Sequence, residues 1–282
     1  MNYTTLITVE ELAPYLSNPD CRIIDCRFTL ADVNKGRMDY QASHIPGAFY
    51  AHLDEELSGE IIPDVTGRHP LPPVAAFSDQ LASWGIDASV QVVAYDYGNG
   101  AIASRLWWML NWLGHERVAV LDGGWPAWQA TGQPVSADLP TISPRPFVAS
   151  PRMDRLCDAA TVEQRRQQAD YCLIDARASR RYAGIEEPID PVAGHIPGAV
   201  NLPFAENVEE RGKWRSSAEL HQRFAQQLAG RPAGQAIVYC GSGVTACHNL
   251  LAMKHAGLGE GQLYAGSWSD WITDPNRPVE KN

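Results

Sequence analysis

The sequence predicts an α/β protein made of two tandem domains of the same kind, each a mostly parallel sheet flanked by helices. Two observations support this fold class: a set of motifs occurs twice in the same order, and short apolar runs alternate with helical patterns. Buried apolar strands interleaved with helices are typical of parallel sheets that are covered on both faces. The 282 residues are enough for two ordinary domains.

Four segments of the N-terminal half return in the C-terminal half. The pairs are CRIIDCR (21–27) with YCLIDAR (171–177), SHIPGAFY (43–50) with GHIPGAVN (194–201), VVAYDYGNG (92–100) with AIVYCGSGV (236–244), and LDGGWPAW (121–128) with YAGSWSDW (264–271). The nearly constant spacing is too long for a solenoid repeat, so it indicates a duplicated domain. We expect domains at 1–132 and 154–282, joined by a proline-rich linker at 133–153.

The elements of the first half follow in order. Thr8 and Glu11 form a capping-box pattern, which predicts a helix through about Leu16. The run RIID (22–25) predicts a short strand that ends in Asp-x-Arg, and the Pro-Gly of the first HIPGA predicts a tight turn before another strand. The run VQVVAY (90–95) predicts a further strand, which leads through a glycine-containing loop into a helix at about 103–113.

The second half repeats this order. Thr161 and Gln164 predict the corresponding capping box, YCLID (171–175) and QAIVYC (235–240) predict strands, and a helix is expected at about 246–256. One difference lies after the last of these strands. The N-terminal copy has Asp96 where the C-terminal copy has Cys240.

Composition and charge exclude several classes of protein. The formal net charge is −10 and no cluster of basic residues is present, so neither nucleic acid nor an anionic membrane surface is an expected partner. No apolar run is long enough to cross a bilayer, and the N-terminus lacks a signal-peptide pattern, so we expect a cytoplasmic protein. The six cysteines show no C-x-x-C and no zinc-type spacing, so we expect free thiols, no metal and no cofactor.

The repeated motifs, together with CGSGVTA (240–246), resemble the two-domain sulfurtransferases of the rhodanese family. In that family the C-terminal repeat carries the catalytic cysteine, so the resemblance implies that Cys240 is catalytic and that Asp96 marks a silent copy. The hexapeptide at 240–245 is similar to that of mercaptopyruvate sulfurtransferases, whereas thiosulfate-preferring members have Cys-Arg-Lys-Gly-Val-Thr.

The resemblance also implies a reaction and partners. Sulfane sulfur would move from 3-mercaptopyruvate, or from thiosulfate, through a persulfide on Cys240 to an acceptor. The acceptor would be a thiol, such as thioredoxin or a small thiol, or cyanide. A thiosulfate sulfurtransferase with another donor preference stays open, as does a non-catalytic module that binds a sulfur carrier.

The loop that follows Cys240 suits sulfur chemistry. The attacking species is a thiolate, and a loop between a strand and a helix can direct backbone N–H groups and the positive end of the helix toward it. We therefore expect a lowered pKa for Cys240. Glycines permit the positive φ angles that such a loop needs. The residues expected to bind substrate here are Gly241, Ser242, Gly243, Val244 and Thr245.

Arg181 matches the family arginine that pairs with the donor's carboxylate or sulfonate, and a guanidinium can hold a carboxylate through two hydrogen bonds. Mercaptopyruvate enzymes usually carry a second arginine some nine positions further on, where this chain has Ile189 or Asp190. An acid there would repel a keto-acid carboxylate. Either another basic residue compensates or the donor differs.

The resemblance further implies a proton relay in which the loop serine contacts the histidine of the first HIPGA and an upstream aspartate. The matching residues are Ser242, His44 and Asp32, which could pass a proton to the leaving enolate. The alternative is structural. His195 occupies the same position in the second repeat without such a role, so a histidine here can simply brace a turn.

Two further alternatives concern cysteine chemistry. A cysteine phosphatase would need an arginine six positions after the cysteine to hold phosphate, and position 246 is Ala. Cys247 could act as a resolving thiol under peroxide stress, or it could pack in the helix that follows.

Overall fold

The computed structural model describes residues 2–281 and divides the chain into two compact units, which are treated separately here. Unit 1 comprises the chain up to Gly59, Pro72–Pro151 and Glu209–Trp214, and unit 2 comprises Glu60–Leu71, Arg152–Val208 and the chain from Arg215 onward. Neither unit is contiguous in sequence. The segment 60–71 therefore packs with unit 2, although the motif order places it within the first repeat.

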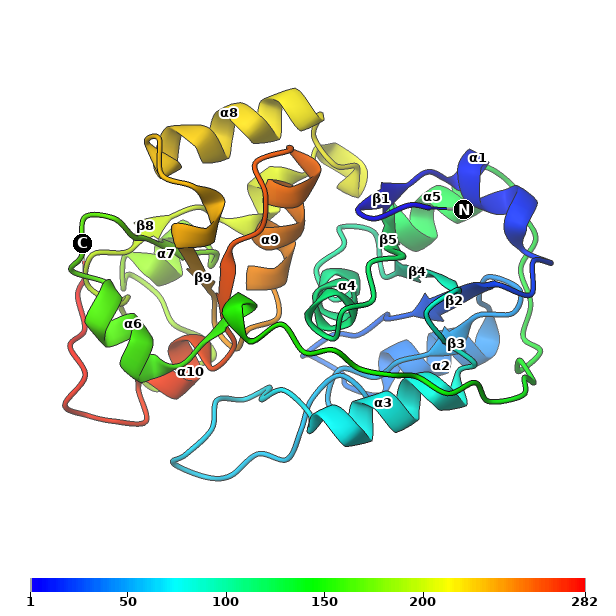
Figure 1. Cartoon of the computed structure of the whole chain (residues 1–282), viewed down its shortest axis with the longest axis horizontal. Coiled ribbons are helices and arrows are strands. Elements are labelled where there is room, and N and C mark those ends of the chain that lie inside the picture. The colour runs from blue at the N-terminus through cyan, green and yellow to red at the C-terminus, as the bar shows by residue number, and fades with distance from the viewer. Residues whose placement is uncertain (1, 282) are drawn as a thin grey trace. The chain divides into compact units, whose positions relative to one another are not determined.

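Unit 1 contains a five-stranded, fully parallel sheet in the order β1-β5-β4-β2-β3 (Figure 1). The strands are β1 (Leu6–Ile7), β2 (Cys21–Asp25), β3 (Phe49–Tyr50), β4 (Gln91–Tyr95) and β5 (Val118–Leu121). The helices are α1 (Val9–Leu12), α2 (Lys35–Ala42), α3 (Val74–Ser83), α4 (Ala103–Trp112) and α5 (Gly124–Ala130), with 3-10 turns η1 (Ala13–Tyr15) and η4 (Glu210–Gly212).

Unit 2 repeats this topology in the order β6-β10-β9-β7-β8, again with all pairs parallel. Its strands are β6 (Leu156–Cys157), β7 (Cys172–Asp175), β8 (Val200–Asn201), β9 (Ala236–Tyr239) and β10 (Gln262–Tyr264). Its helices are α6 (Ala159–Arg165), α7 (Ser179–Tyr182), α8 (Ser217–Leu228), α9 (Ala246–His255) and α10 (Ser267–Trp271), with 3-10 turns η2 (Met153–Arg155), η3 (Phe204–Asn207) and η5 (Ala233–Gln235). The predicted α/β class with two parallel sheets is confirmed.

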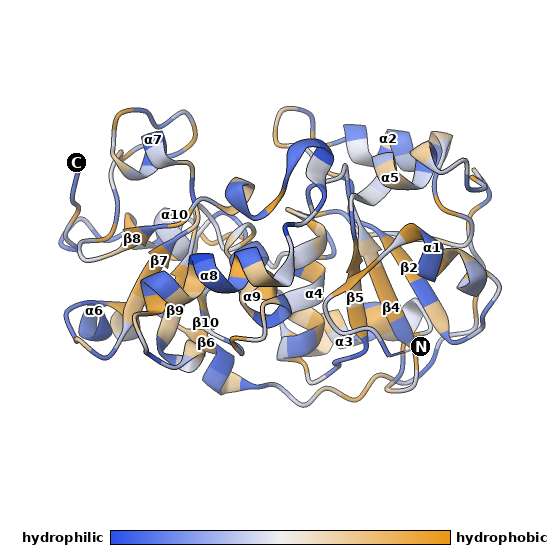
Figure 2. Ribbon diagram, turned by 90° about the horizontal axis from the view of Figure 1, so that it is seen from above, coloured by the Kyte–Doolittle hydropathy of each residue, from blue (hydrophilic) through white to orange (hydrophobic). Residues whose placement is uncertain are grey.

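The inner strands β2, β4, β7 and β9 are buried along their whole length, as expected of parallel sheets covered on both faces. Figure 2 colours the strands of both sheets as largely hydrophobic. Helices α4 and α9 follow the central strands β4 and β9. Every residue of α4 and the first eight residues of α9 are buried, so these helices lie in the interior instead of showing a polar outer face. Each of the two equivalent strand–loop–helix segments is therefore anchored at both ends by buried structure.

The helix starts differ in one place from the sequence prediction. The capping box at Thr8 is present, with the Thr8 hydroxyl accepting the Glu11 N–H and the Glu11 carboxylate accepting the Thr8 N–H. The predicted start at Thr161 is wrong. Helix α6 begins after Asp158, whose carboxylate accepts the N–H of Thr161. Asp and Thr are both good N-caps, and here the aspartate, in extended conformation, takes that place.

Candidate active site

Cys240 lies directly after β9, at the start of the loop that enters α9. Its backbone N–H donates to the Ser267 hydroxyl at 3.0 Å, and its carbonyl accepts the Trp268 N–H at 3.0 Å. These contacts fasten the loop to the glycine-tryptophan segment of the same repeat. Cys240 is only 2% exposed, so its side chain is buried within the loop.

The surroundings of the Cys240 sulfur favour a thiolate. Burial is the largest effect and opposes charge, but hydrogen bonds from the Thr245 hydroxyl and from the N–H groups of Ser242, Ala246 and Gly243 outweigh it and lower the pKa. In Cys157, where no such donors oppose it, burial raises the pKa to about 12. The lowered pKa that the loop sequence predicts for Cys240 therefore agrees with the hydrogen bonds around its sulfur.

Gly243 provides the conformation that the loop requires. Its φ is +77°, a region that favours glycine, and a Cβ atom there would lie 2.2 Å from the Ala265 carbonyl oxygen. A side chain at this position would push the loop away from the segment after β10. Close packing and backbone shape both therefore require glycine at 243.

The equivalent loop of unit 1 holds Asp96 in the same kind of cradle. One carboxylate oxygen accepts the N–H groups of Gly98 and Gly100 at 2.9 and 3.0 Å. The other accepts those of Ile102 and Ala103 at 2.9 and 3.2 Å. The N-terminal cradle is thus filled by the chain's own fixed anion.

Arg181 lies in α7, with its side chain 15% exposed. Its Nε donates to Glu187 at 3.0 Å, and its Nη2 contacts Glu187 at 2.7 Å and Asp190 at 2.9 Å. Its Nη1 would be 3.5 Å from a Cβ placed on Gly241, the residue after Cys240. The arginine predicted to bind the donor therefore stands beside the cysteine loop.

A second arginine, which the sequence motifs did not indicate, reaches the same place. Arg68, in the segment 60–71 of unit 2, forms an ion pair with Asp190 through Nη1. Its Nη2 would lie 2.9 Å from a Cβ on Gly241. Asp190 thus contacts two guanidinium groups, one through each carboxylate oxygen.

The structure gives Ser242 a different partner from the one predicted. The Ser242 hydroxyl lies 2.7 Å from Nδ1 of His69, whereas the resemblance implied a pairing with His44. His44 faces backbone carbonyls on both sides, with Nδ1 2.7 Å from the Tyr40 oxygen and Nε2 3.1 Å from the Asp138 oxygen. The Asp32 side chain is exposed and accepts the Asn34 N–H.

The contacts of His195, the equivalent histidine of the second repeat, favour a structural role for His44. His195 repeats the arrangement, with Nδ1 2.8 Å from the Tyr182 carbonyl oxygen and its ring stacked on that tyrosine. His44 likewise stacks on Tyr40. Both HIPGA histidines brace a turn. His69 belongs to a segment with no counterpart among the repeated motifs, and its only sequence signal is a histidine beside an arginine in GRHPLP (67–72).

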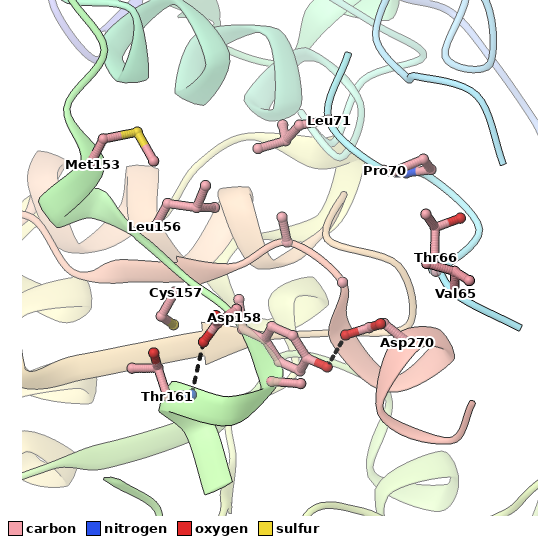
Figure 3. Close-up of a pocket in the computed structure, with 15 residues that line it drawn as sticks. Val65, Thr66, Pro70, Leu71, Met153, Leu156, Cys157, Asp158, Thr161 and Asp270 are labelled. Atoms are coloured by element: carbon pink, nitrogen blue, oxygen red, sulfur yellow. Dashed lines mark hydrogen bonds between the residues drawn. The ribbon is translucent and has the colours of Figure 1, made fainter. Parts of the chain in front are cut away.

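A separate cavity of about 390 Å³ lies in unit 2, between segment 65–71 and the strands β6 and β10. Figure 3 shows that its two acidic side chains are already engaged: Asp158 accepts the Thr161 N–H, and Asp270 is bonded to Tyr264. The rest of its lining is largely apolar, including Leu71 and Leu156. The polar groups beside Cys240 are not part of this cavity.

Within residues 2–281, no cluster of three or more His, Cys, Asp or Glu side chains is arranged to hold a metal ion. Cys247 is buried and its sulfur lies 3.3 Å from the Gly243 carbonyl oxygen, a position within the helix packing. None of the helices in the described part of the chain has the length and apolar character needed to cross a membrane.

Comparison with known proteins agrees with the fold. The Rhodanese-like domain matches twice, at residues 8–131 and 158–274. A Pseudomonas aeruginosa protein named "Probable 3-mercaptopyruvate sulfurtransferase" is 48% identical over 99% of both chains. The thiosulfate sulfurtransferase of Cricetulus griseus is 33% identical over 96% of this chain and 92% of its own.

A solved structure shows the same likeness. The 3-mercaptopyruvate sulfurtransferase from Leishmania major superimposes with a TM-score of 0.85 at 33% identity, covering 98% of this chain and 75% of its own. Two parallel sheets, each with a strand–loop–helix anion cradle, define a tandem rhodanese-type protein. The chain belongs to the rhodanese family of sulfurtransferases.

Proposed function

We propose that this protein is a 3-mercaptopyruvate sulfurtransferase that carries sulfur as a persulfide on Cys240. The observation that supports this most directly is the lowered pKa of Cys240 within a ring of N–H and hydroxyl donors. The 48% identity to a full-length relative with a matching name supports the donor class. The C-terminal repeat would do the chemistry and the N-terminal repeat, with Asp96 in its cradle, would be silent.

The first half-reaction is a displacement at sulfur. The Cys240 thiolate attacks the sulfur of 3-mercaptopyruvate, an S–S bond forms, and the C–S bond breaks with its electron pair passing to the enolate of pyruvate. The proton of the donor's thiol is the one that the enolate finally takes up. The products are pyruvate and the Cys240 persulfide anion, so atoms and charge balance without a cofactor.

The pair formed by Ser242 and His69 supports the proton transfer. The hydroxyl lies 2.7 Å from the imidazole nitrogen, within the range in which a proton can pass between them. Ser242 also donates its N–H to the Cys240 sulfur, which places its hydroxyl beside the reacting atoms. We assign this pair the role of moving the thiol proton to the leaving enolate.

The second half-reaction returns the thiolate. An acceptor thiolate or cyanide attacks the outer sulfur, the S–S bond breaks, and its electron pair returns to Cys240. The acceptor becomes a persulfide or thiocyanate; thioredoxin-type thiols and small thiols fit this chemistry. All six cysteines are free, which suits a reducing compartment such as the cytoplasm.

The test is kcat/KM for 3-mercaptopyruvate and for thiosulfate, measured side by side with cyanide as acceptor. We expect mercaptopyruvate to be preferred, and a mass increase of one sulfur atom on Cys240 when the donor is added without an acceptor. Preference for thiosulfate would favour the alternative of a thiosulfate sulfurtransferase. Absence of turnover with both donors would favour a sulfur-carrier-binding module.

A further inference from the structure

The ion pair between Arg68 and Asp190 lies beside Gly241, the residue that follows Cys240. The side chain of Asp190 is 2% exposed and lies between Arg68 and Arg181, which contact its two oxygens separately. An acid placed in this way is already neutralised by cations on both sides. Its effect is to hold two guanidinium groups in position, and it does not present a bare charge to a substrate.

Arg68 retains donor capacity that the protein does not use. Within residues 2–281, its Nε is buried and has no hydrogen-bond partner. Buried polar groups are nearly always bonded, so this unbonded N–H leaves Arg68 able to donate a hydrogen bond to an added anion. Burial is the largest influence on the pKa of Arg68 and lowers it, so an added anion would stabilise the charged form of this group.

Gly241 lets the arginines approach the cysteine. A side chain at this position would meet Nη2 of Arg68 at 2.9 Å and Nη1 of Arg181 at 3.5 Å. Both terminal nitrogens of Arg181 lie on the Gly241 side, at 3.5 and 3.6 Å from that Cβ position, and Nη2 also contacts Glu187 and Asp190. Guanidinium N–H groups from two separate segments thus converge on one backbone position next to the nucleophile.

We propose that Arg68 is the second cationic anchor for the donor's carboxylate, and that Asp190 is the positioning residue that holds it. This rests on the proposed function and names how that same site selects an α-keto carboxylate. Arg181 binds the carboxylate from α7, and Arg68 binds it from the segment 60–71. A carboxylate held between two guanidinium groups leaves the carbon-bound sulfur free to face Cys240.

The test compares two donors that differ only in the carboxylate: 3-mercaptopyruvate and mercaptoacetone, in which a methyl group replaces it. For Arg68→Ala, we expect the KM for 3-mercaptopyruvate to rise tenfold or more with little change in kcat. The KM for mercaptoacetone should stay within about twofold of the wild-type value. Loss of a charge-assisted contact of about 1.4 kcal/mol corresponds to that tenfold change.

Arg180→Ala is the matched control, because Arg180 neighbours Arg181 but its side chain is 64% exposed and pairs with Glu186. It should leave both donors unchanged. An equal loss with both donors in Arg68→Ala, or no loss with either, would overturn the role of Arg68. The proposed function is judged separately by the wild-type protein, which must turn over 3-mercaptopyruvate and lose that turnover in Cys240→Ser.

Three further variants guard against misfolding and test Asp190. Arg68→Lys keeps the charge and most of the packing, so we expect a smaller loss confined to 3-mercaptopyruvate. Asp190→Ala should also raise the KM for 3-mercaptopyruvate. The double variant Arg68→Ala with Asp190→Ala should lose less than the product of the two single losses, because the part of the Asp190 effect that acts through Arg68 is already gone, while its contact with Arg181 remains to be lost. Fully additive losses would contradict the positioning role.

Discussion

The two cradles of this molecule, one around Cys240 and one around Asp96, are built alike and hold different side chains. Both follow the central strand of a parallel sheet, both precede a buried helix, and both direct backbone N–H groups inward. In unit 1 the side chain in the cradle is the carboxylate of Asp96, which cannot carry sulfur. In unit 2 it is the thiol of Cys240, and hydrogen bonds from the same kind of donors lower its pKa. The backbone creates a place for negative charge, and the side chain decides whether that charge is chemically useful.

The largest loss of activity should come from giving both cradles the same side chain, an aspartate. Cys240→Asp puts a carboxylate among the donors of the working loop, and we expect a folded protein with no measurable sulfur transfer. Cys240→Ser should abolish transfer as well. Activity and persulfide formation by mass spectrometry are the measurements. Cys247→Ser is the control and should retain most activity, and turnover in either Cys240 variant would remove the assignment of the nucleophile.

The next effect concerns the pair formed by Ser242 and His69 beside the C-terminal cradle. His69→Gln should lower kcat by about a hundredfold, the scale of general acid–base catalysis, because the proton path from Ser242 is interrupted. Ser242→Ala should give a similar loss. The double variant should be no worse than either single one, since both act as one unit. Independent, multiplying losses would show that the two residues act separately.

A smaller effect should follow from removing one donor of the thiolate. Thr245→Val deletes the hydroxyl that donates to Cys240, which raises the pKa of the thiol. The reactive thiolate is present above that pKa, so the acidic limb of the kcat/KM profile should move to higher pH. At low pH we expect a several-fold loss, and at alkaline pH little loss. Rates at intervals of pH with saturating cyanide test this, and an unmoved acidic limb would contradict it.

The smallest effect on catalysis is expected from the cradle around Asp96. Asp96→Ala leaves four inward N–H groups of unit 1 without their acceptor. We expect a loss of folding stability on the order of 3 kcal/mol, since unsatisfied buried donors are costly, while kcat/KM below the unfolding temperature stays near that of the wild type. Urea unfolding and kinetics measure the two quantities. A strong loss of activity in the intact folded protein would show that the Asp96 loop takes part in transfer.

Prediction from the sequence succeeded where structure is local. The central strands, the glycine loops and the helices α4 and α9 follow from apolar runs and turn residues that are close in the chain. The environment of Cys240 is local as well, because the groups that donate hydrogen bonds to its sulfur lie within the next six residues of the chain. The start of α6 was missed by three residues, since two good capping residues compete there and packing chooses between them.

Residues that reach the site from far along the chain could not be predicted in this way. His69 and Arg68 lie in a segment that joins unit 2 across more than a hundred residues of sequence, and no repeated motif marks them. His44 was named because the family resemblance implied it, and its contacts with backbone carbonyls match those of its repeat partner His195, which favours the alternative that both brace a turn. The repeated motifs reveal the common architecture and contain Cys240, whereas His69 and Arg68 lie outside them.

The sequence by itself determined the duplicated α/β architecture, the loop that lowers the pKa of Cys240 and the replacement of its twin by Asp96. Each of these is read from strand–loop–helix segments that are contiguous in the chain. Local propensity and hydrogen bonding largely set the conformation of such segments. Only the tertiary structure decided which histidine meets Ser242 and how Asp190 came to hold two arginines. Those contacts join distant segments, and their geometry depends on how the whole unit packs.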